Sequence, residues 1–399
     1  MLKEKPKLLP SISLKDVYGP NLVLNPRPSF SNYGWLPTDP VKLDFLTGSP
    51  LLIAGTMPVI CSHFVATENV MFLLSNTGLE PAPFCHIYHT SAEYQNIMDS
   101  IRKQKKKLVV NHLHPSNEIK RNDYWIDPDI IAFLNNKANL NCLVPSEHIP
   151  RRTVVLKAEI KKVLRGARNY PLILKAATGL SAGGGYGVFI CKCSPDVDDA
   201  YESLQTCEAV VLEEYIDIHK NYCIQFAGTV NGQIIYLGIS EQIVDPSGIY
   251  GGNWLDKNHI PPKTVIDLGR QIMENACGLG YSGIGGFDIV VSRDNRVLVI
   301  DLNFRLNGST PALLLEDSIV KTFNASVLLF RNWKARITQG EFLSVSREAI
   351  EHSRLIPISL YDPLSGPCSD SVYFSGILFG ASREDVLAKQ LVLARYGIR

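Results

Sequence analysis

Apolar runs and amphipathic stretches alternate over the first 120 positions of the chain. The run Pro50–Met57 predicts a buried strand that enters a turn at Gly55. Residues 65–77 have helical spacing, and residues 108–110 form another short apolar run. Alternating strand and helix signals are typical of an α/β unit with a parallel sheet. We therefore predict a Rossmann-like domain over residues 1–120.

Beyond residue 125 the pattern changes to many short strands with a few helices between them. Helical spacing occurs at 127–140, 157–168, 263–279 and 311–330. Strand-like runs occur at 171–177, 186–193, 208–216, 222–229, 233–239, 285–292 and 296–303. Arg293–Asn295 joins the last two runs as a hairpin. These signals predict a second domain at 121–345 and a small C-terminal domain at 346–399, with strands at 354–360 and 372–379 and a helix from Arg383.

Composition places the chain among soluble globular proteins of two to three domains. It has 399 residues, of which 45% are hydrophobic and 20% charged. Forty Lys and Arg residues balance 39 Asp and Glu residues, which argues against nucleic-acid binding over the whole surface. The apolar run 49–66 is interrupted by Pro58, Ser62 and His63, unlike a membrane span of about 20 residues. Because the start also lacks the apolar core of a signal peptide, we expect a cytoplasmic protein without nucleic-acid or membrane partners.

Cysteine and histidine positions give no metal-site pattern. The nine cysteines are scattered, and only Cys191 and Cys193 lie close together. Alternate residues of a strand point to opposite faces, so we expect reduced thiols rather than a disulfide framework or a zinc site. His86 with His89, and His112 with His114, have ligand-like spacings but no Cys or acidic partner in a metal-site pattern. We interpret all four as surface or core histidines, with a substrate-binding role left open.

The first cluster of chemical interest is a lysine followed by a glycine-rich loop. Lys175 lies near the end of the predicted strand 171–177, and five glycines follow between positions 179 and 187. Glycine lets a backbone approach phosphate oxygens with its N–H groups, and lysine supplies a point charge for phosphate. No helix begins after the glycines, so this is neither a Walker P-loop nor a dinucleotide fingerprint. A phosphate-binding loop and a flexible hairpin without a ligand both stay open.

The second cluster lies on the predicted hairpin 285–303. Asp301, Asn303 and Arg305 alternate and so share one face, and Asp288 lies across the hairpin. Two carboxylates and an amide oxygen suit Mg²⁺ with nucleotide phosphates, and Arg305 suits a phosphate or a developing acyl phosphate. Because unpaired charges on a buried strand are costly, the alternative is a structural ladder of ion pairs.

The third cluster is the acidic end of the strand 208–216. An apolar strand that ends in Glu213 and Glu214 can present backbone groups and a carboxylate to an adenine. A solvated strand end is the alternative.

In their order and spacing the three clusters resemble the ATP-grasp superfamily over residues 125–330. The resemblance implies an α/β (α+β) protein with a Rossmann-like pre-ATP-grasp N-terminal domain, a two-part ATP-grasp fold and a small C-terminal domain. It implies ATP and Mg²⁺ as cofactors. The reaction it implies is phosphorylation of a carboxylate, followed by attack of an amine or a thiol on the acyl phosphate.

The resemblance also implies roles for individual residues. The lysines at 137 and 175 would contact the ATP phosphates beneath a lid that contains Gly183, Gly184 and Gly185. The nucleoside would be held by Glu213, Glu214, Ile216 and Asn221, the last at the ribose. Mg²⁺ would be held by Asp288, Asp301 and Asn303. The catalytic residues would be Lys175 and Arg305.

The domain layout resembles the pheganomycin-type peptide ligase group, which includes butirosin-type ligases that join glutamate to a carrier protein. The Lys-, Asn- and Ile-rich composition favours the butirosin type, and hence antibiotic biosynthesis with L-glutamate and an acidic acyl carrier protein. The basic run Arg102–Lys107 would suit such a partner, or it is a solvated helix end. An amino acid–peptide ligase without a carrier protein, a non-catalytic ATP-binding module and a homo-oligomer all stay open.

Overall fold

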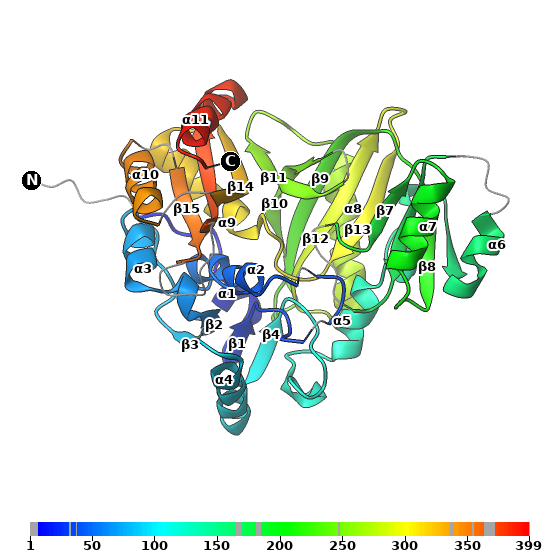
Figure 1. Ribbon diagram of the computed structural model, residues 1–399, viewed down its shortest axis with the longest axis horizontal. Coiled ribbons are helices and arrows are strands. Elements are labelled where there is room, and N and C mark those ends of the chain that lie inside the picture. Colours follow the sequence, from blue (N-terminus) through cyan, green and yellow to red (C-terminus); the bar gives the residue numbers. More distant parts are fainter. Residues whose placement is uncertain are drawn as a thin grey trace, which may run out of the picture.

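The computed structural model describes residues 7–31, 33–36, 38–164, 170–180, 185–245, 248–335, 339–352, 355–362 and 372–398. Three sheets lie within these ranges (Figure 1). This mixed α/β architecture confirms the predicted fold class.

The N-terminal sheet is parallel, with strand order β3-β2-β1-β4. Its strands are β1 (Leu22–Asn25), β2 (Val59–Ser62), β3 (Cys85–Tyr88) and β4 (Lys107–Val110). Helix α3 (Glu68–Ser75) joins β2 to β3, and α4 (Ser91–Lys103) joins β3 to β4. The chain therefore runs outward from β1 to β3 and then returns to the opposite side of β1. Helices α1 (Leu14–Tyr18) and α2 (Pro40–Phe45) flank β1 in sequence.

The prediction of a strand at Pro50–Met57 is wrong. Residues Ser49–Leu52 form a 3₁₀ turn, and the next strand starts only at Val59. The neighbouring residues Leu51 and Leu52 are both fully buried, so buried and exposed positions do not alternate in this run. A short, wholly buried run does not reveal its backbone conformation from periodicity.

A second, antiparallel sheet has the order β5-β8-β6-β7 and stands at the right of Figure 1. Its strands are β5 (Arg152–Leu156), β6 (Leu172–Ala177), β7 (Val188–Cys191) and β8 (Ala209–Glu214). Two helices belong to this part of the chain, α6 (Ile160–Leu164) and α7 (Ser194–Ser203). Helix α7 packs on the sheet through Val197 and Ala200.

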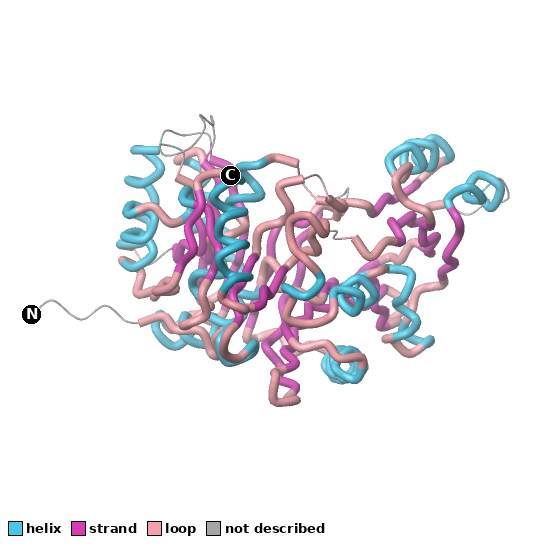
Figure 2. The backbone as a smooth tube through the Cα atoms, turned by 90° about the horizontal axis from the view of Figure 1, so that it is seen from below, coloured by secondary structure: helices cyan, strands magenta, loops and turns pink. Residues whose placement is uncertain are grey.

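The largest sheet has eight strands in the order β13-β12-β9-β10-β11-β14-β16-β15. The strands are β9 (Ile218–Gly228), β10 (Ile234–Val244), β11 (Tyr250–Asp256), β12 (Gly283–Ser292), β13 (Val297–Asn303), β14 (Val327–Ala335), β15 (Leu355–Leu360) and β16 (Val372–Gly380). Its helices are α8 (Lys263–Gly278), α9 (Thr310–Phe323), α10 (Gln339–Glu351) and α11 (Arg383–Arg395). Strands β15 and β16 lie beyond residue 345 yet continue this sheet. Figure 2 shows the strands from below, with helices on their outer sides. The domain limits at 120 and 345 stay predictions.

A helix and a strand in this part of the chain differ from the sequence prediction. The helix expected at 311–330 ends at Phe323, because Asn324 takes the left-handed conformation with φ of 49°, and β14 follows. Strand β11 was not predicted, because it begins Tyr250-Gly-Gly, and glycine is a poor strand former. Gly252 has φ of +139°, and a Cβ there would lie 2.3 Å from the Phe330 carbonyl oxygen.

One hydrophobic core joins the N-terminal sheet to the eight-stranded sheet. Leu24 and Val59 share it with Phe330 and Phe374. The indole N–H of Trp125 also donates to the carbonyl of Ser282 at 2.7 Å. These contacts fix the start of β12 against the part of the chain that contains the N-terminal sheet. No helix among the described residues is long and apolar enough to cross a membrane.

Candidate active site

The hairpin β12–β13 places two carboxylates opposite each other. Asp288 pairs in register with Asp301, and Gly286 pairs with Asn303. Strand β9 lies on the other side of β12, where Cys223 pairs with Asp288. One antiparallel register therefore brings the predicted metal ligands together. Most residues of these two strands are buried.

The two carboxylates have opposite electrostatic surroundings. Burial raises the pKa of Asp288, and the negative charge of Asp301 raises it further. Burial also acts to raise the pKa of Asp301, but the ammonium groups of Lys137 and Lys175 lower it below its usual range. Lys137 forms an ion pair with Asp301, while the amide of Gln242 donates to Asp288 at 2.5 Å. An added cation would allow both carboxylates to ionise.

A buried ion pair connects the small antiparallel sheet to this hairpin. The Nζ of Lys175 donates to Glu213 Oε1 at 2.5 Å and to the carbonyl of Ile300 at 2.9 Å. Burial lowers the pKa of Lys175, although Glu213 opposes this effect. The guanidinium of Arg152 lies 3.7 Å from Glu213 Oε2 and donates to the carbonyl of Lys137. The sequence prediction placed Glu213 at an adenine, whereas here its carboxylate faces Lys175 and Arg152.

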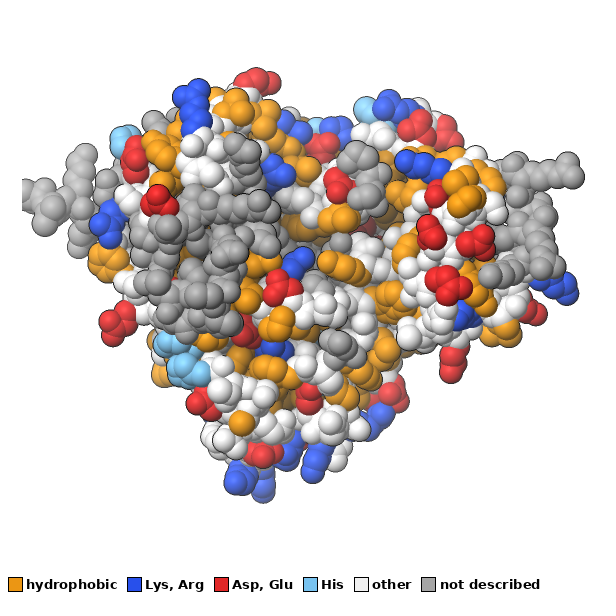
Figure 3. All heavy atoms as spheres, viewed as in Figure 1, with side chains coloured by type: hydrophobic (Ala, Val, Ile, Leu, Met, Phe, Trp, Pro, Cys, Tyr) orange, Lys and Arg blue, Asp and Glu red, His pale blue; other side chains and the backbone are white. Residues whose placement is uncertain are grey.

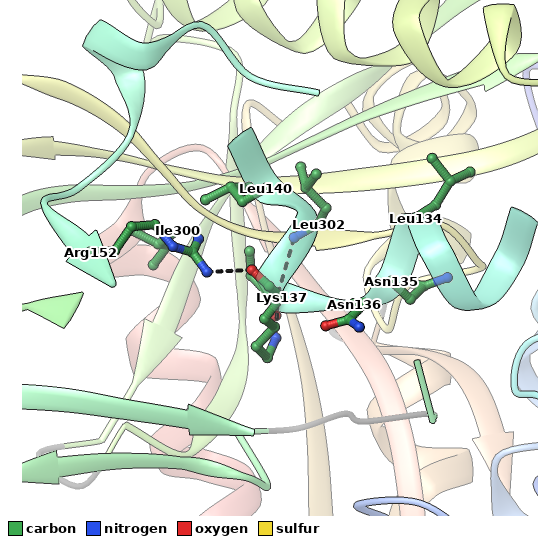
Figure 4. Close-up of a pocket in the computed structure, with 9 residues that line it drawn as sticks. Leu134, Asn135, Asn136, Lys137, Leu140, Arg152, Ile300 and Leu302 are labelled. Atoms are coloured by element: carbon green, nitrogen blue, oxygen red, sulfur yellow. Dashed lines mark hydrogen bonds and ion pairs between the residues drawn. The ribbon is translucent and has the colours of Figure 1, made fainter. Parts of the chain in front are cut away.

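A pocket opens beside these residues, between η4 (Lys137–Cys142) and β13. Figure 4 shows Arg152 reaching the backbone of Lys137 in this pocket. The pocket is lined by Leu134, Asn135, Asn136, Lys137, Leu140, Arg152, Ile300, Asp301 and Leu302. The predicted lysine at 137 and the predicted metal ligand at 301 thus share one pocket.

Arg305 lies just beyond the end of β13, where burial lowers its pKa. Asn135, the last residue of α5 (Pro128–Asn135), accepts from Arg305 Nη1 at 3.3 Å. The same Asn135 oxygen accepts from the backbone N–H of Phe304 at 3.0 Å. Helix α5 thereby fixes the backbone before Arg305 and contacts its guanidinium.

The remaining predicted nucleoside residues lie on β8, β9 and the link between them. The Glu214 carboxylate is 2.8 Å from Arg296 Nη1, and its other oxygen is 3.0 Å from Arg151. Ile216 is buried in a small apolar cluster. Asn221 lies on β9, and its Oδ1 is buried without a hydrogen-bond partner among the described residues.

The glycine loop is only partly described. Gly183 and Gly184 lie outside the described residues. Gly185 has φ of +90°, and a Cβ there would lie 3.1 Å from the carbonyl oxygen of Gly248. The loop after β6 therefore approaches the loop between β10 and β11 more closely than a larger residue would allow.

Three residues of the site were missed from the sequence: Asn135, Arg152 and Gln242. None belongs to a motif, and each meets a site residue that is distant in sequence: Asn135 meets Arg305, Arg152 meets Glu213, and Gln242 meets Asp288. Gln242 lies on the partly buried strand β10, beyond the expected run 233–239, so no sequence signal marked it.

The residues present fit a nucleotide with Mg²⁺. Glu213 Oε2 and Asn221 Oδ1 are buried and lack hydrogen-bond partners among the described residues. Buried polar atoms normally have a partner, and a bound nucleotide would supply one to each. The oxygen donors of Asp288, Asp301 and Asn303 suit Mg²⁺. No group of three His, Cys, Asp or Glu side chains that could hold a metal occurs in the described part of the chain, so phosphate oxygens would complete such a site.

Comparison with known proteins agrees with this geometry. Residues 150–303 match the family model described as L-aspartate–L-methionine ligase, ATP grasp, and residues 13–132 match the N-terminal domain model of the same ligase. The chain is an ATP-grasp ligase. Its two matched segments correspond to the amino-acid ligase type, and they do not support the pheganomycin or butirosin group expected from the domain layout and composition.

Solved structures show the same fold in other ATP-grasp enzymes. An ADP complex of N5-carboxyaminoimidazole ribonucleotide synthetase is 12% identical, with a TM-score of 0.60 and 98% of each chain covered. The ADP complex of the Staphylococcus aureus N5-carboxyaminoimidazole synthetase is 14% identical, with a TM-score of 0.59 and coverage of 97% and 99%. Campylobacter jejuni biotin carboxylase is 14% identical, with a TM-score of 0.56 and coverage of 95% and 91%. Structures similar to this ligase have thus been crystallised with nucleotides.

A curated relative matches only part of its own length. The α subunit of mitochondrial methylcrotonoyl-CoA carboxylase from Dictyostelium discoideum is 24% identical over 235 residues, which are 56% of this chain and 30% of the relative. The chain therefore spans about a third of that protein. The cytoplasmic location and the partners expected of this ATP-grasp ligase stay predictions.

Proposed function

We propose that this ATP-grasp ligase joins L-aspartate to L-methionine in an ATP- and Mg²⁺-dependent reaction. The observation that carries an ADP-forming ligation is the pairing of Asp288 with Asp301 beside Lys137, Lys175 and Arg305. The choice of amino acids rests on the two family models, which match the N-terminal and the ATP-grasp segments separately.

The reaction we propose has two steps. A carboxylate oxygen of the first amino acid attacks the γ-phosphorus of ATP, and ADP leaves. The amine of the second amino acid then attacks the acyl carbon, loses a proton and displaces phosphate. The product is a dipeptide, and no enzyme nucleophile is required.

Each residue of the cluster has a part in these steps. Lys137 and Lys175 would bind phosphate oxygens, and both are already held within the cluster by carboxylates. Mg²⁺, held by Asp288, Asp301 and Asn303, would neutralise negative charge on the transferred phosphoryl group. Arg305 would stabilise the charge that develops between phosphate and carboxylate. Asn221 Oδ1 and Glu213 Oε2, the Glu213 oxygen that Lys175 does not occupy, would supply acceptors to the nucleoside.

The test is ADP formation with all pairs of the twenty amino acids, with product masses measured. Turnover that requires aspartate and methionine, yields their dipeptide and disappears in Asp301→Asn supports the proposal. Turnover with glutamate and a phosphopantetheinylated carrier protein would instead support the carrier-protein reaction expected from sequence. Absence of any Asp301-dependent turnover would favour a non-catalytic ATP-binding module.

A further inference from the structure

The carboxyl edge of the N-terminal sheet lies at a topological switch point. The chain leaves β1 toward β2 on one side, whereas β4 returns on the other side of β1. In open parallel sheets, ligands bind outside the carboxyl ends of the strands at such a point. The segments that follow β1 and β4 here carry Asn25, at the end of β1, and the histidines 112 and 114 after β4.

The two histidines differ in their hydrogen bonding. His114 is fully engaged, with Nδ1 at 2.9 Å from Glu118 Oε2 and Nε2 at 3.1 Å from the Arg27 carbonyl. His112 is only 8% exposed, yet its Nδ1 has no hydrogen-bond partner among the described residues. A buried polar atom without a partner is costly, so a packing role does not account for His112. The Oδ1 of Asn25 at the same edge is in the same condition.

His112 lies within electrostatic reach of the catalytic arginine. Burial lowers the pKa of His112 well below its ordinary value, and the positive charge of Arg305 contributes to the shift. Leu113, next to His112, packs in one small hydrophobic cluster with Ile131 of α5, and Asn135 at the end of α5 accepts from Arg305 Nη1 at 3.3 Å. The segment that carries His112 and the guanidinium of Arg305 thus both contact α5.

We propose that His112 binds the amino acid whose carboxylate is phosphorylated, by donating a hydrogen bond from Nδ1 to that substrate beside Arg305. A carboxylate fits this position because the guanidinium attracts an anion and a carboxylate oxygen accepts from a neutral imidazole N–H. The geometry thus adds a substrate-binding residue that belongs to none of the ATP-grasp clusters. This inference rests on the proposed ligase function.

The experiment compares His112→Leu, which removes the donor, with His112→Asn, which keeps a polar side-chain atom near the position of Nδ1. His112→Leu should raise the KM of one amino acid about tenfold or more, leave the KM of ATP within about twofold, and leave the unfolding temperature equal or higher. His112→Asn should recover most of the affinity. His114→Leu is the comparator for a structural histidine and should lower the unfolding temperature.

Two results would overturn the inference. One is an unchanged KM for both amino acids in His112→Leu. The other is a loss of unfolding temperature in His112→Leu like that of His114→Leu, because that would mark His112 as structural.

A calorimetric titration separates this inference from the proposed reaction. Wild-type protein and His112→Leu are each titrated with the twenty amino acids in the presence of Mg²⁺ and ADP. If no aspartate–methionine turnover exists but an amino acid binds the wild type and not His112→Leu, the proposed reaction fails and the substrate site stands. If no amino acid binds, or both proteins bind equally, the site is overturned.

Discussion

Two buried polar networks of this protein differ in how completely their polar atoms are hydrogen-bonded. In the N-terminal unit, Glu118 accepts from Ser29 at 2.6 Å and from Ser31 at 3.0 Å, and its other oxygen contacts His114. At the hairpin β12–β13, by contrast, burial raises the pKa of Asp288. Nearby on β8, one oxygen of Glu213 has no hydrogen bond within the described part of the chain. Both networks are buried, unlike the charged side chains that Figure 3 shows scattered over much of the surface.

The difference separates support from chemistry. A complete network strengthens the fold because each buried donor and acceptor is satisfied. An incomplete one costs stability until a ligand supplies the missing partners. The Glu118 network therefore positions the carboxyl edge of the N-terminal sheet, while the hairpin network is prepared for a nucleotide and a cation. The following predictions break one network or the other.

The largest effect is expected from Asp301→Asn. The change removes a carboxylate that faces Lys137 and that we assign to Mg²⁺, so turnover should fall by roughly 10³-fold or more. ADP release measures it. Asp294→Asn, in the exposed hairpin turn, is the control and should stay within about twofold; an active Asp301→Asn would contradict the assignment.

Lys175→Met should reduce stability strongly. It leaves Glu213, whose side chain is 2% exposed, as a buried charge without its main partner, at a cost of about 3–5 kcal/mol in urea unfolding. Lys175→Met combined with Glu213→Leu should recover most of this loss, because both charges are then removed. Neither variant should bind ATP. Equal stability of the single and the double variant would contradict this, because Arg152 alone would then be enough to neutralise the buried Glu213 charge.

Glu118 should make stability depend on pH in the acid range. Burial acts to raise its pKa, but hydrogen bonds from His114 and Ser29 lower it to about 2, from 4.5. The folded-state pKa is depressed, so the stabilisation is present above about pH 4.5 and is lost as the pH falls toward 2. Glu118→Gln should be about 1–3 kcal/mol less stable at neutral pH.

Thermal unfolding between pH 2 and 7 measures this effect. The difference between wild type and Glu118→Gln should shrink as the pH falls below 4.5. A difference that stays constant over this range would contradict the role of the Glu118 charge.

The smallest effect is expected at an exposed ion pair. Arg121 is 56% exposed and contacts Asp127 and Asp129 at 2.6 and 2.8 Å. Exposed pairs contribute little, so Arg121→Ala should change the free energy of unfolding by less than about 1 kcal/mol. A larger loss would show that this loop supports α5, which carries Asn135.

The sequence by itself determined much of the predicted ATP-grasp site. The strand-like runs identified β12 and β13, and alternation placed Asp301 and Asn303 on one face because residues two apart in a strand share a face. Arg305, expected on the same face, lies just beyond the end of β13. It did not separate the 3₁₀ turn after Pro50 from a strand, since a wholly buried run lacks periodicity. It also missed β11, whose glycines hide the strand signal.

Only the tertiary structure decided which distant side chains meet. The Asp288–Asp301 register, the contact of Gln242 with Asp288 and the pair Lys175–Glu213 join strands that are separated by up to 46 residues. His112 looked like His114 in sequence. The fold satisfies both ring nitrogens of His114, whereas Nδ1 of His112 has no hydrogen-bond partner among the described residues. Hydrogen-bond satisfaction depends on neighbours brought together by packing, and no local pattern encodes those neighbours.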